Sequence, residues 1–118
     1  VRLHFLKNIL FSMSVKLSNS LEPLKKRVNK STLTKILENT KESYLKFVIG
    51  NDFLENAIVE IEDILKNIPQ CEVYLMPLGD SSEAIDINSE KVVNLAIKYG
   101  FKYSDRLHIR IWNNKRGV

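Results

Sequence analysis

The sequence has 118 residues, a formal net charge of +4, 44% hydrophobic residues and 27% charged residues. This composition excludes an intrinsically disordered chain, and no apolar run is long enough to cross a bilayer. The single cysteine, Cys71, excludes an internal disulfide and a cysteine-rich metal site. The length predicts one domain over residues 1–118, and we expect it in the cytoplasm because the opening residues lack a signal-peptide cleavage site.

The first half of the chain predicts two strands with a helix between them. Residues 9–14 and 44–50 are rich in β-branched and aromatic side chains, as strands are. Between them, Ser31 as N-cap and the apolar positions up to about Thr40 predict a helix.

The second half continues the alternation. Apolar residues at helical spacing predict a helix over 53–68, with a capping box at Asp52 and a stop at Pro69. A strand follows at 72–77, then a helix from residue 88 or 89 to a left-handed C-cap at Gly100, then a last strand at 107–112. Strands that alternate with helices form parallel βα units, so the predicted fold class is α/β.

In parallel α/β folds, ligands bind at the carboxyl ends of the strands. Polar segments follow all four predicted strands, at residues 14–20, 50–52, 76–79 and 113–118. We therefore expect these four segments to share one rim.

The last predicted strand alternates in character. Leu107, Ile109 and Ile111 would point to one face, and His108, Arg110 and Trp112 to the other. Two interpretations fit this pattern equally well: a barrel strand with His108 and Arg110 facing the interior, or an edge strand with one solvated face.

The segments "KLSNS", "YLKFVIG", "VYLMPLG" and "GFKYSDRLHIRIWNNKRGV" together resemble the C-terminal half of the 7-carboxy-7-deazaguanine synthase family, in the family's order and spacing. The resemblance implies half of a partial (β/α) barrel of the radical S-adenosylmethionine type. The family is a carbon–nitrogen lyase of queuosine and 7-deazapurine biosynthesis. It converts 6-carboxy-5,6,7,8-tetrahydropterin to 7-carboxy-7-deazaguanine with S-adenosylmethionine, a 4Fe-4S cluster and Mg²⁺.

The chain departs from the family pattern at three places. Val15 stands where the family commonly has proline, Leu78 where it has glutamate, and Asn113 where it has glycine. The CxxxCxxC loop that ligates the cluster is also lacking, because iron–sulfur ligation requires thiolates and Cys71 alone cannot supply three. We expect the chain to be inactive without an N-terminal half barrel, which leaves a truncation, a split-gene product and a degenerate remnant open.

Site residues carried over from the resemblance lie at the strand ends. Ser14 and Lys16 would contact S-adenosylmethionine, and Met76 and Pro77 would support its adenine. His108 would lie beside the pterin, and the terminal residues would close over it and pair with its carboxylate: Lys115, Arg116 and Val118. Ordinary structural roles remain open for these residues, such as a turn for Ser14 and core packing for Met76.

The expected partners are the pterin substrate and a half-barrel partner or a second copy. A small non-catalytic α/β module that binds a nucleotide or a protein is the alternative function. A membrane is not an expected partner. Nucleic acid is not expected either, because the aromatic residues lie inside apolar strands and are not interleaved with cations as a stacking platform requires.

Overall fold

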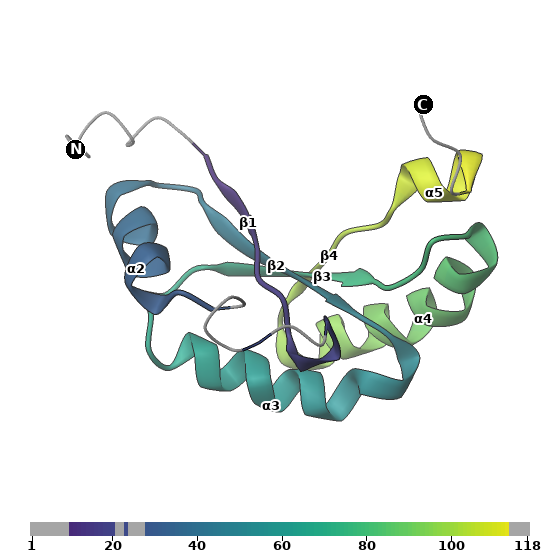
Figure 1. The fold of residues 1–118 in the computed structure, drawn as a ribbon, viewed down its shortest axis with the longest axis horizontal. Coiled ribbons are helices and arrows are strands. Elements are labelled where there is room, and N and C mark those ends of the chain that lie inside the picture. The colour runs from purple at the N-terminus through teal and green to yellow at the C-terminus, as the bar shows by residue number, and fades with distance from the viewer. Residues whose placement is uncertain (1–9, 21–22, 24–27, 114–118) are drawn as a thin grey trace.

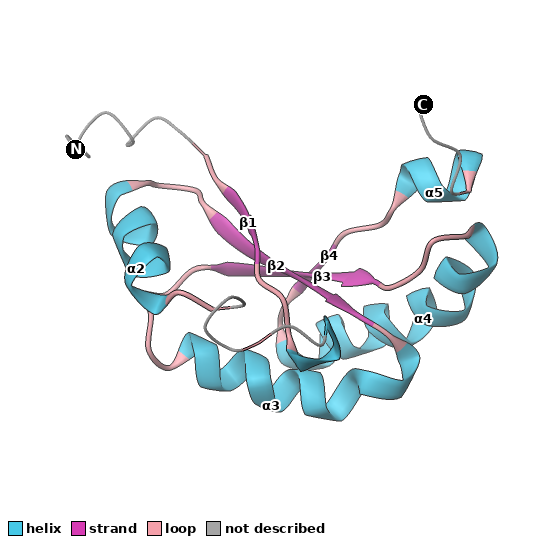
Figure 2. Ribbon diagram, in the orientation of Figure 1, coloured by secondary structure: helices cyan, strands magenta, loops and turns pink. Residues whose placement is uncertain are grey.

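The structure, a computed structural model, describes residues 10–20, 23 and 28–113. Its centre is a four-stranded, all-parallel sheet in the order β1-β2-β3-β4. The strands are β1 (Ser12–Ser14), β2 (Tyr44–Ile49), β3 (Glu72–Pro77) and β4 (Lys102–Tyr103). Helices alternate with these strands along the chain (Figure 2), which confirms the α/β class.

The α-helices in the described part of the chain are α2 (Lys30–Asn39), α3 (Leu54–Leu65), α4 (Ser82–Tyr99) and α5 (Leu107–Trp112). Single 3-10 turns lie at η2 (Ser18–Ser20) and η3 (Asn51–Phe53). Each strand lies beside the one before it, so right-handed crossovers place successive helices on the same face. In Figure 1, α3 and α4 both run below the sheet, and no described helix lies across the opposite face.

Burial alternates strictly along the two central strands. In β2, Leu45, Phe47 and Ile49 are fully buried, and the residues between them are half-buried. The same alternation in β3 buries Val73 and Leu75. Since successive side chains of a strand point to opposite faces, one face of the sheet forms the core with α2, α3 and α4, and we call it the covered face.

The other face, here called the open face, carries the half-buried residues. Two rows of strand partners define it: Ser12, Tyr44 and Glu72 in one, and Ser14, Lys46, Tyr74 and Lys102 in the next toward the carboxyl ends. Val48 and Met76 form a third pair still nearer those ends. This face is mixed in polarity, whereas the covered face is aliphatic and aromatic.

The helix interiors agree with the predicted periodicity, but several ends differ. In α3, the expected apolar residues Ala57, Ile58, Ile61 and Ile64 are buried. The predicted capping box at Asp52 is wrong, because η3 intervenes and Phe53 occupies the N-cap without a side-chain hydrogen bond. In α2 the N-cap is Asn29 instead of Ser31, and its Oδ1 accepts a hydrogen bond from the Thr32 amide at 3.1 Å.

Helix α4 begins at Ser82, well before the predicted start at residue 88 or 89. Ser81 is the N-cap, and its Oγ accepts a hydrogen bond from the Ala84 amide at 3.1 Å. The sequence pattern does not reveal the first turns of α4, because the apolar residues there are not confined to one helical face: Ile85 is buried, whereas Ile87 is exposed. The predicted end is confirmed, since Gly100 is left-handed with φ 73° and the Phe101 amide donates to the Ala96 oxygen.

The predicted strand at residues 107–112 is wrong, since this segment is the helix α5. The place beside β3 that a strand at 107–112 would occupy is filled by β4, a two-residue strand that the sequence pattern did not predict. After β4 the Ser104 amide donates to the Leu75 oxygen at 2.9 Å, and the chain then turns away from the sheet. Six alternating residues also fit a short helix, in which Ile109 is buried while Leu107 and Ile111 are exposed.

The described sheet is open, with β1 and β4 at its two edges. Within the ranges that the structure describes, no helix combines the length and the apolar character that crossing a membrane requires.

Candidate functional site

The carboxyl ends of β1, β2 and β3 are held together by hydrogen bonds that continue past the strands. The Val15 amide donates to the Lys46 oxygen at 3.1 Å, and the Leu78 amide donates to the Ile49 oxygen at 2.8 Å. Proline has no amide hydrogen, so the family's usual residue at position 15 could not donate the first of these bonds. The tips of β1, β2 and β3 therefore meet at one edge, as expected for three of the four segments. The fourth segment, 113–118, follows a helix instead of the predicted strand, and all of it except Asn113 lies outside the described residues.

A cavity of about 330 Å³ lies at this edge, between the tips of β1, β2 and β3. We call it the rim cavity, and its lining residues are Ser14, Val15, Lys16, Leu17, Asn19, Ser20, Lys46, Val48 and Leu78. Among the described residues, the lining includes two lysines and no acidic side chain. Its apolar members offer a surface for a ring, and its hydroxyl, amide and ammonium groups can bind an anionic or polar group.

The loop that carries Lys16 is attached to α3. The Ser18 amide donates to Glu60 Oε1 at 2.9 Å, and the Ser18 hydroxyl donates to the other carboxylate oxygen, Oε2. Val15 and Leu17, on either side of Lys16, are buried in the core. These contacts position the loop, so Lys16 lines the rim cavity from a supported backbone.

A second cavity of about 450 Å³ adjoins the tip of β3 and is lined by Leu78, Gly79, Asp80, Ala84, Asn88 and Arg106. Asn88 Nδ2 donates to the Leu78 oxygen at 2.6 Å. A Cβ at Gly79 would lie 2.9 Å from the Ala84 Cβ, so glycine permits the close approach of the β3 tip to α4. Leu78 is 45% exposed and lines both cavities.

The structure places the predicted cofactor residues in two groups. Ser14 and Lys16 both line the rim cavity. Met76 lies half-buried on the open face, and Pro77 is buried on the covered face. Leu78 and Lys46, which the sequence reading did not assign to the site, line the rim cavity with Ser14; the signal for Lys46 was its place among apolar residues in "YLKFVI".

His108 is exposed and lies in α5, not on an inward strand face as predicted. Helix α5 is fixed to α4 by the Arg110 guanidinium, which pairs with Asp86, and by the Ser82 amide, which donates to Asn113 Oδ1 at 2.8 Å. Arg110 Nε also binds Asp105 Oδ2 at 2.6 Å. Hydrogen bonds to Asp105 and then Asp86 raise the pKa of Arg110, so this residue is committed to ion pairs and holds α5 beyond the strand tips.

The predicted substrate residues Lys115, Arg116 and Val118 lie outside the described residues, so their contact with a ligand stays a prediction.

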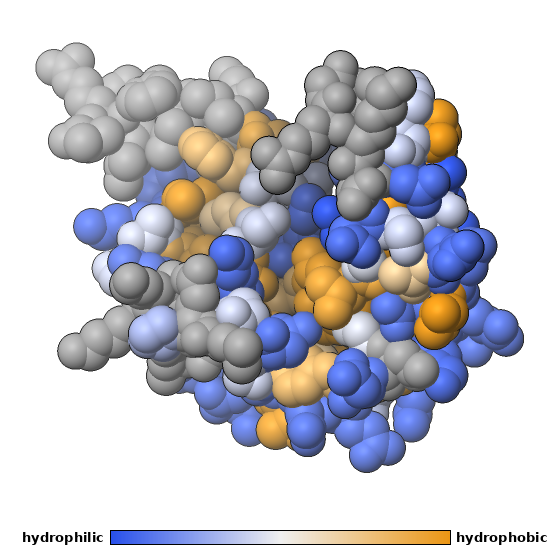
Figure 3. Space-filling view, turned by 45° about the vertical axis from the view of Figure 1, so that its right-hand side comes forward, coloured by the Kyte–Doolittle hydropathy of each residue, from blue (hydrophilic) through white to orange (hydrophobic). Residues whose placement is uncertain are grey.

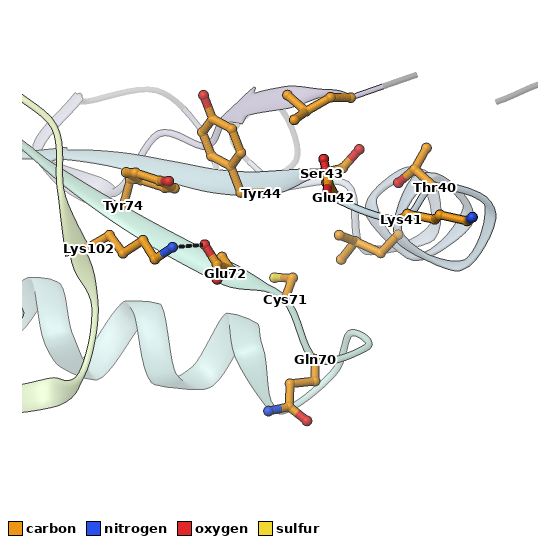
Figure 4. Close-up of a pocket in the computed structure, with 12 residues that line it drawn as sticks. Thr40, Lys41, Glu42, Ser43, Tyr44, Gln70, Cys71, Glu72, Tyr74 and Lys102 are labelled. Carbon is orange, nitrogen blue, oxygen red and sulfur yellow. Dashed lines mark ion pairs between the residues drawn. The ribbon is translucent and has the colours of Figure 1, made fainter. Parts of the chain in front are cut away.

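The amino end of the sheet carries a different pocket of about 580 Å³ (Figure 4). Lys102 Nζ binds Glu72 Oε2 there at 2.7 Å, and the rings of Tyr44 and Tyr74 lie 4.5 Å apart between centroids. Cys71 also lines it, and burial raises the pKa of its thiol. A raised thiol pKa disfavours the thiolate that a metal or a nucleophilic reaction requires.

The donor groups do not fit an iron–sulfur cluster. The only cysteine of the sequence lies at the amino end of β3, across the sheet from the rim cavity. Within the described residues, no group of three histidine, cysteine or acidic side chains is placed to bind a metal ion. The rim cavity combines apolar surface with hydroxyl and ammonium groups.

A singly wound parallel sheet with cavities at its carboxyl ends defines the class: an α/β protein with cavities at its strand tips, which is where parallel α/β folds bind ligands. No protein-family profile matches the chain, and no solved structure matches it with significance. Curated proteins similar to it include 7-carboxy-7-deazaguanine synthases from three organisms. The protein from Rhodopirellula baltica is 30% identical over 95 residues, which cover 79% of this chain and 36% of the relative.

The second relative, from Pyrobaculum aerophilum, is 31% identical over 90 residues, covering 75% of this chain and 39% of its own length. The third, from Halobacterium salinarum, is 29% identical over 97 residues, which cover 75% of this chain and 36% of the relative. The chain is therefore a distant homologue of the 7-carboxy-7-deazaguanine synthases and spans little more than a third of the length of these relatives.

Proposed function

We propose that this chain is the C-terminal, ligand-binding part of a radical S-adenosylmethionine enzyme that forms 7-carboxy-7-deazaguanine from 6-carboxy-5,6,7,8-tetrahydropterin. The observation that carries the proposal is the homology to synthases of that name, combined with a ligand-sized cavity of mixed polarity at the carboxyl ends of parallel strands.

The open sheet supports a barrel that is completed by another part. Parallel sheets are generally covered on both faces, yet within the described ranges helices cover only one. In Figure 3, which brings the right-hand side of Figure 1 forward, hydrophobic side chains gather in the hollowed middle among hydrophilic ones. We propose that the open face is the barrel interior, and that a cluster-bearing half barrel continues the sheet beside β1.

The roles proposed for the chain's own residues are those that the family resemblance implies. The Ser14 hydroxyl and the Lys16 ammonium would bind the polar groups of S-adenosylmethionine, and Met76 would support its adenine. Pro77 is buried on the covered face and is not placed to contact a ligand on the open face. His108, Lys115, Arg116 and Val118 would close the substrate side. The bound cofactor and cluster would supply the radical, while this chain binds, orients and excludes water.

Activity would require a partner because the cluster ligands cannot come from this chain. One cysteine cannot replace three, and its position at the amino end of the sheet is unsuitable. We propose that the chain alone binds ligand without turnover.

The alternative is a non-catalytic α/β module that binds a nucleotide or a protein at the same edge. Leu78 favours the non-catalytic module, because the family commonly has glutamate at this position and the rim of this chain therefore lacks that carboxylate. The two functions share the rim cavity and differ in turnover.

Reconstitution separates them. The 118-residue chain would be joined to the N-terminal, cysteine-bearing part of the Rhodopirellula baltica relative, and the cluster rebuilt under anaerobic conditions. We expect cleavage of S-adenosylmethionine and formation of 7-carboxy-7-deazaguanine, measured by mass spectrometry, and a loss of both with Ser14→Ala combined with Lys16→Met.

The control is the relative's own two parts, joined at the same point. If that control turns over and the hybrid neither cleaves S-adenosylmethionine nor binds it, the enzymatic function is rejected. Binding without cleavage would favour the non-catalytic module.

A further inference from the structure

Lys46 occupies an unusual position in the middle of the sheet. It is the third residue of β2, half-buried on the open face, with the buried Leu45 and Phe47 on either side. Its strand partners are Ser14 on β1 and Tyr74 on β3. Neighbouring strands are about 4.8 Å apart, so the Ser14 hydroxyl and the Lys46 ammonium can reach one small group.

The charge of Lys46 is not neutralised by a described residue, whereas that of Lys102 is. Lys102 lies in the same row on the open face and binds Glu72 at 2.7 Å. Lys46 makes no ion pair or hydrogen bond through its side chain with any residue in the described ranges. A half-buried cation loses part of its hydration, so a ligand anion is its natural partner.

The surroundings of Lys46 favour an anion over a cation. Among the described residues, no acidic side chain lines the rim cavity beside the Lys46 ammonium group. Val48 and Leu78 line the same cavity and give an apolar surface next to the polar group. This arrangement suits a ring that carries a carboxylate.

We propose that Lys46, with the Ser14 hydroxyl opposite it, binds a ligand carboxylate in the rim cavity while Val48 and Leu78 contact the attached ring. This proposal rests on the proposed function, from which the identity of the ligand is taken. The carboxylate could belong to S-adenosylmethionine or to the pterin, and the recognition chemistry is the same for both.

Two matched ligand pairs test the proposal on the full 118-residue chain by calorimetry. Pterin-6-carboxylate is compared with pterin, and S-adenosylmethionine with decarboxylated S-adenosylmethionine, which lacks only the carboxylate. We expect the carboxylate-bearing member of at least one pair to bind about tenfold more tightly, in the range of a charge-assisted hydrogen bond. The pair that shows the preference identifies the source of the carboxylate.

Lys46→Met keeps most of the side-chain volume and removes the charge, so it should abolish the preference. Lys102→Met is the matched control, because it removes a lysine from the same row and face that is already paired. It should leave the preference intact. Circular dichroism spectra and thermal melts establish that both variants are folded.

The proposal is overturned if neither pair shows a carboxylate preference, or if Lys46→Met retains it. Equal binding within both pairs rejects the role of Lys46 and leaves the proposed function standing, since S-adenosylmethionine would still bind. If Lys46→Met does not fold, Lys46→Gln takes its place. A salt titration provides a second measurement, because the preference of the wild-type chain for the carboxylate-bearing ligand must weaken as ionic strength rises.

Discussion

The two faces of the sheet are built from the same strands and differ in almost every physical property. On the covered face, Leu45, Phe47, Ile49 and Leu75 are 0% exposed and pack against helices. On the open face, lysine, tyrosine, serine and glutamate alternate with these residues and are only half-buried or exposed. Stability is thus concentrated on one face, and the groups capable of recognition are left on the other.

The largest predicted effect follows from the covered face. Phe47→Ala should lower the free energy of unfolding by about 3–5 kcal/mol, because it leaves a cavity in a fully buried core. Urea denaturation measures it. Tyr74→Ala, on the open face of the adjacent strand, is the control, and an equal loss there would mean that the open face is also part of the core.

An intermediate effect is expected where α4 returns the chain to β4. Gly100 has φ 73°, and no atom lies within 4 Å of the position that an added Cβ would take, so alanine would cost only its conformational strain. Gly100→Ala should therefore reduce stability by roughly 1–2 kcal/mol.

Gly100→Asn is the matched variant for this position, because asparagine adopts the left-handed conformation more readily. It should destabilise less than alanine in the same urea titration. If the two variants were equally stable to urea, the left-handed cap would not determine the cost.

The smallest effect is expected at α5, beyond the strand tips. Arg110→Met removes the pairs with Asp86 and Asp105. It should speed hydrogen exchange at the Arg110 and Asn113 amides, which donate within α5, while lowering global stability less than Gly100→Ala does. Arg106→Met is the control, and equal acceleration by it would show that the ion pairs do not hold α5.

Much of the fold follows from periodicity. The alternation of "YLKFVI" and "EVYLMP" predicts β2 and β3, and the spacing of Ala57, Ile58, Ile61 and Ile64 predicts α3, because burial on one side leaves a regular pattern. The prediction of a strand at residues 107–112 failed because a pattern of six residues fits both the helical and the strand period. Contacts with α4 favour the helix, and β4 already occupies the sheet edge that a strand would need.

The candidate site was only partly predictable. Strand-end polarity indicated the segment 14–20, because parallel strands bring their carboxyl ends together, and the family resemblance singled out Ser14 and Lys16 within it. Lys46 and Leu78 needed the structure, since strand register and the side-by-side placement of β1, β2 and β3 decide which side chains share a cavity. The place of His108 was misjudged because it depended on the strand that proved to be α5.

The most direct test of the central claim is an NMR titration of the ¹⁵N-labelled chain with S-adenosylmethionine. If the open face binds ligand at its carboxyl edge, the amides of Ser14, Lys16, Lys46 and Leu78 will shift saturably, while those of residues 41–44 and 70–72 at the amino end stay unchanged. Shifts concentrated at the amino end, or no saturable shifts at all, would contradict the account.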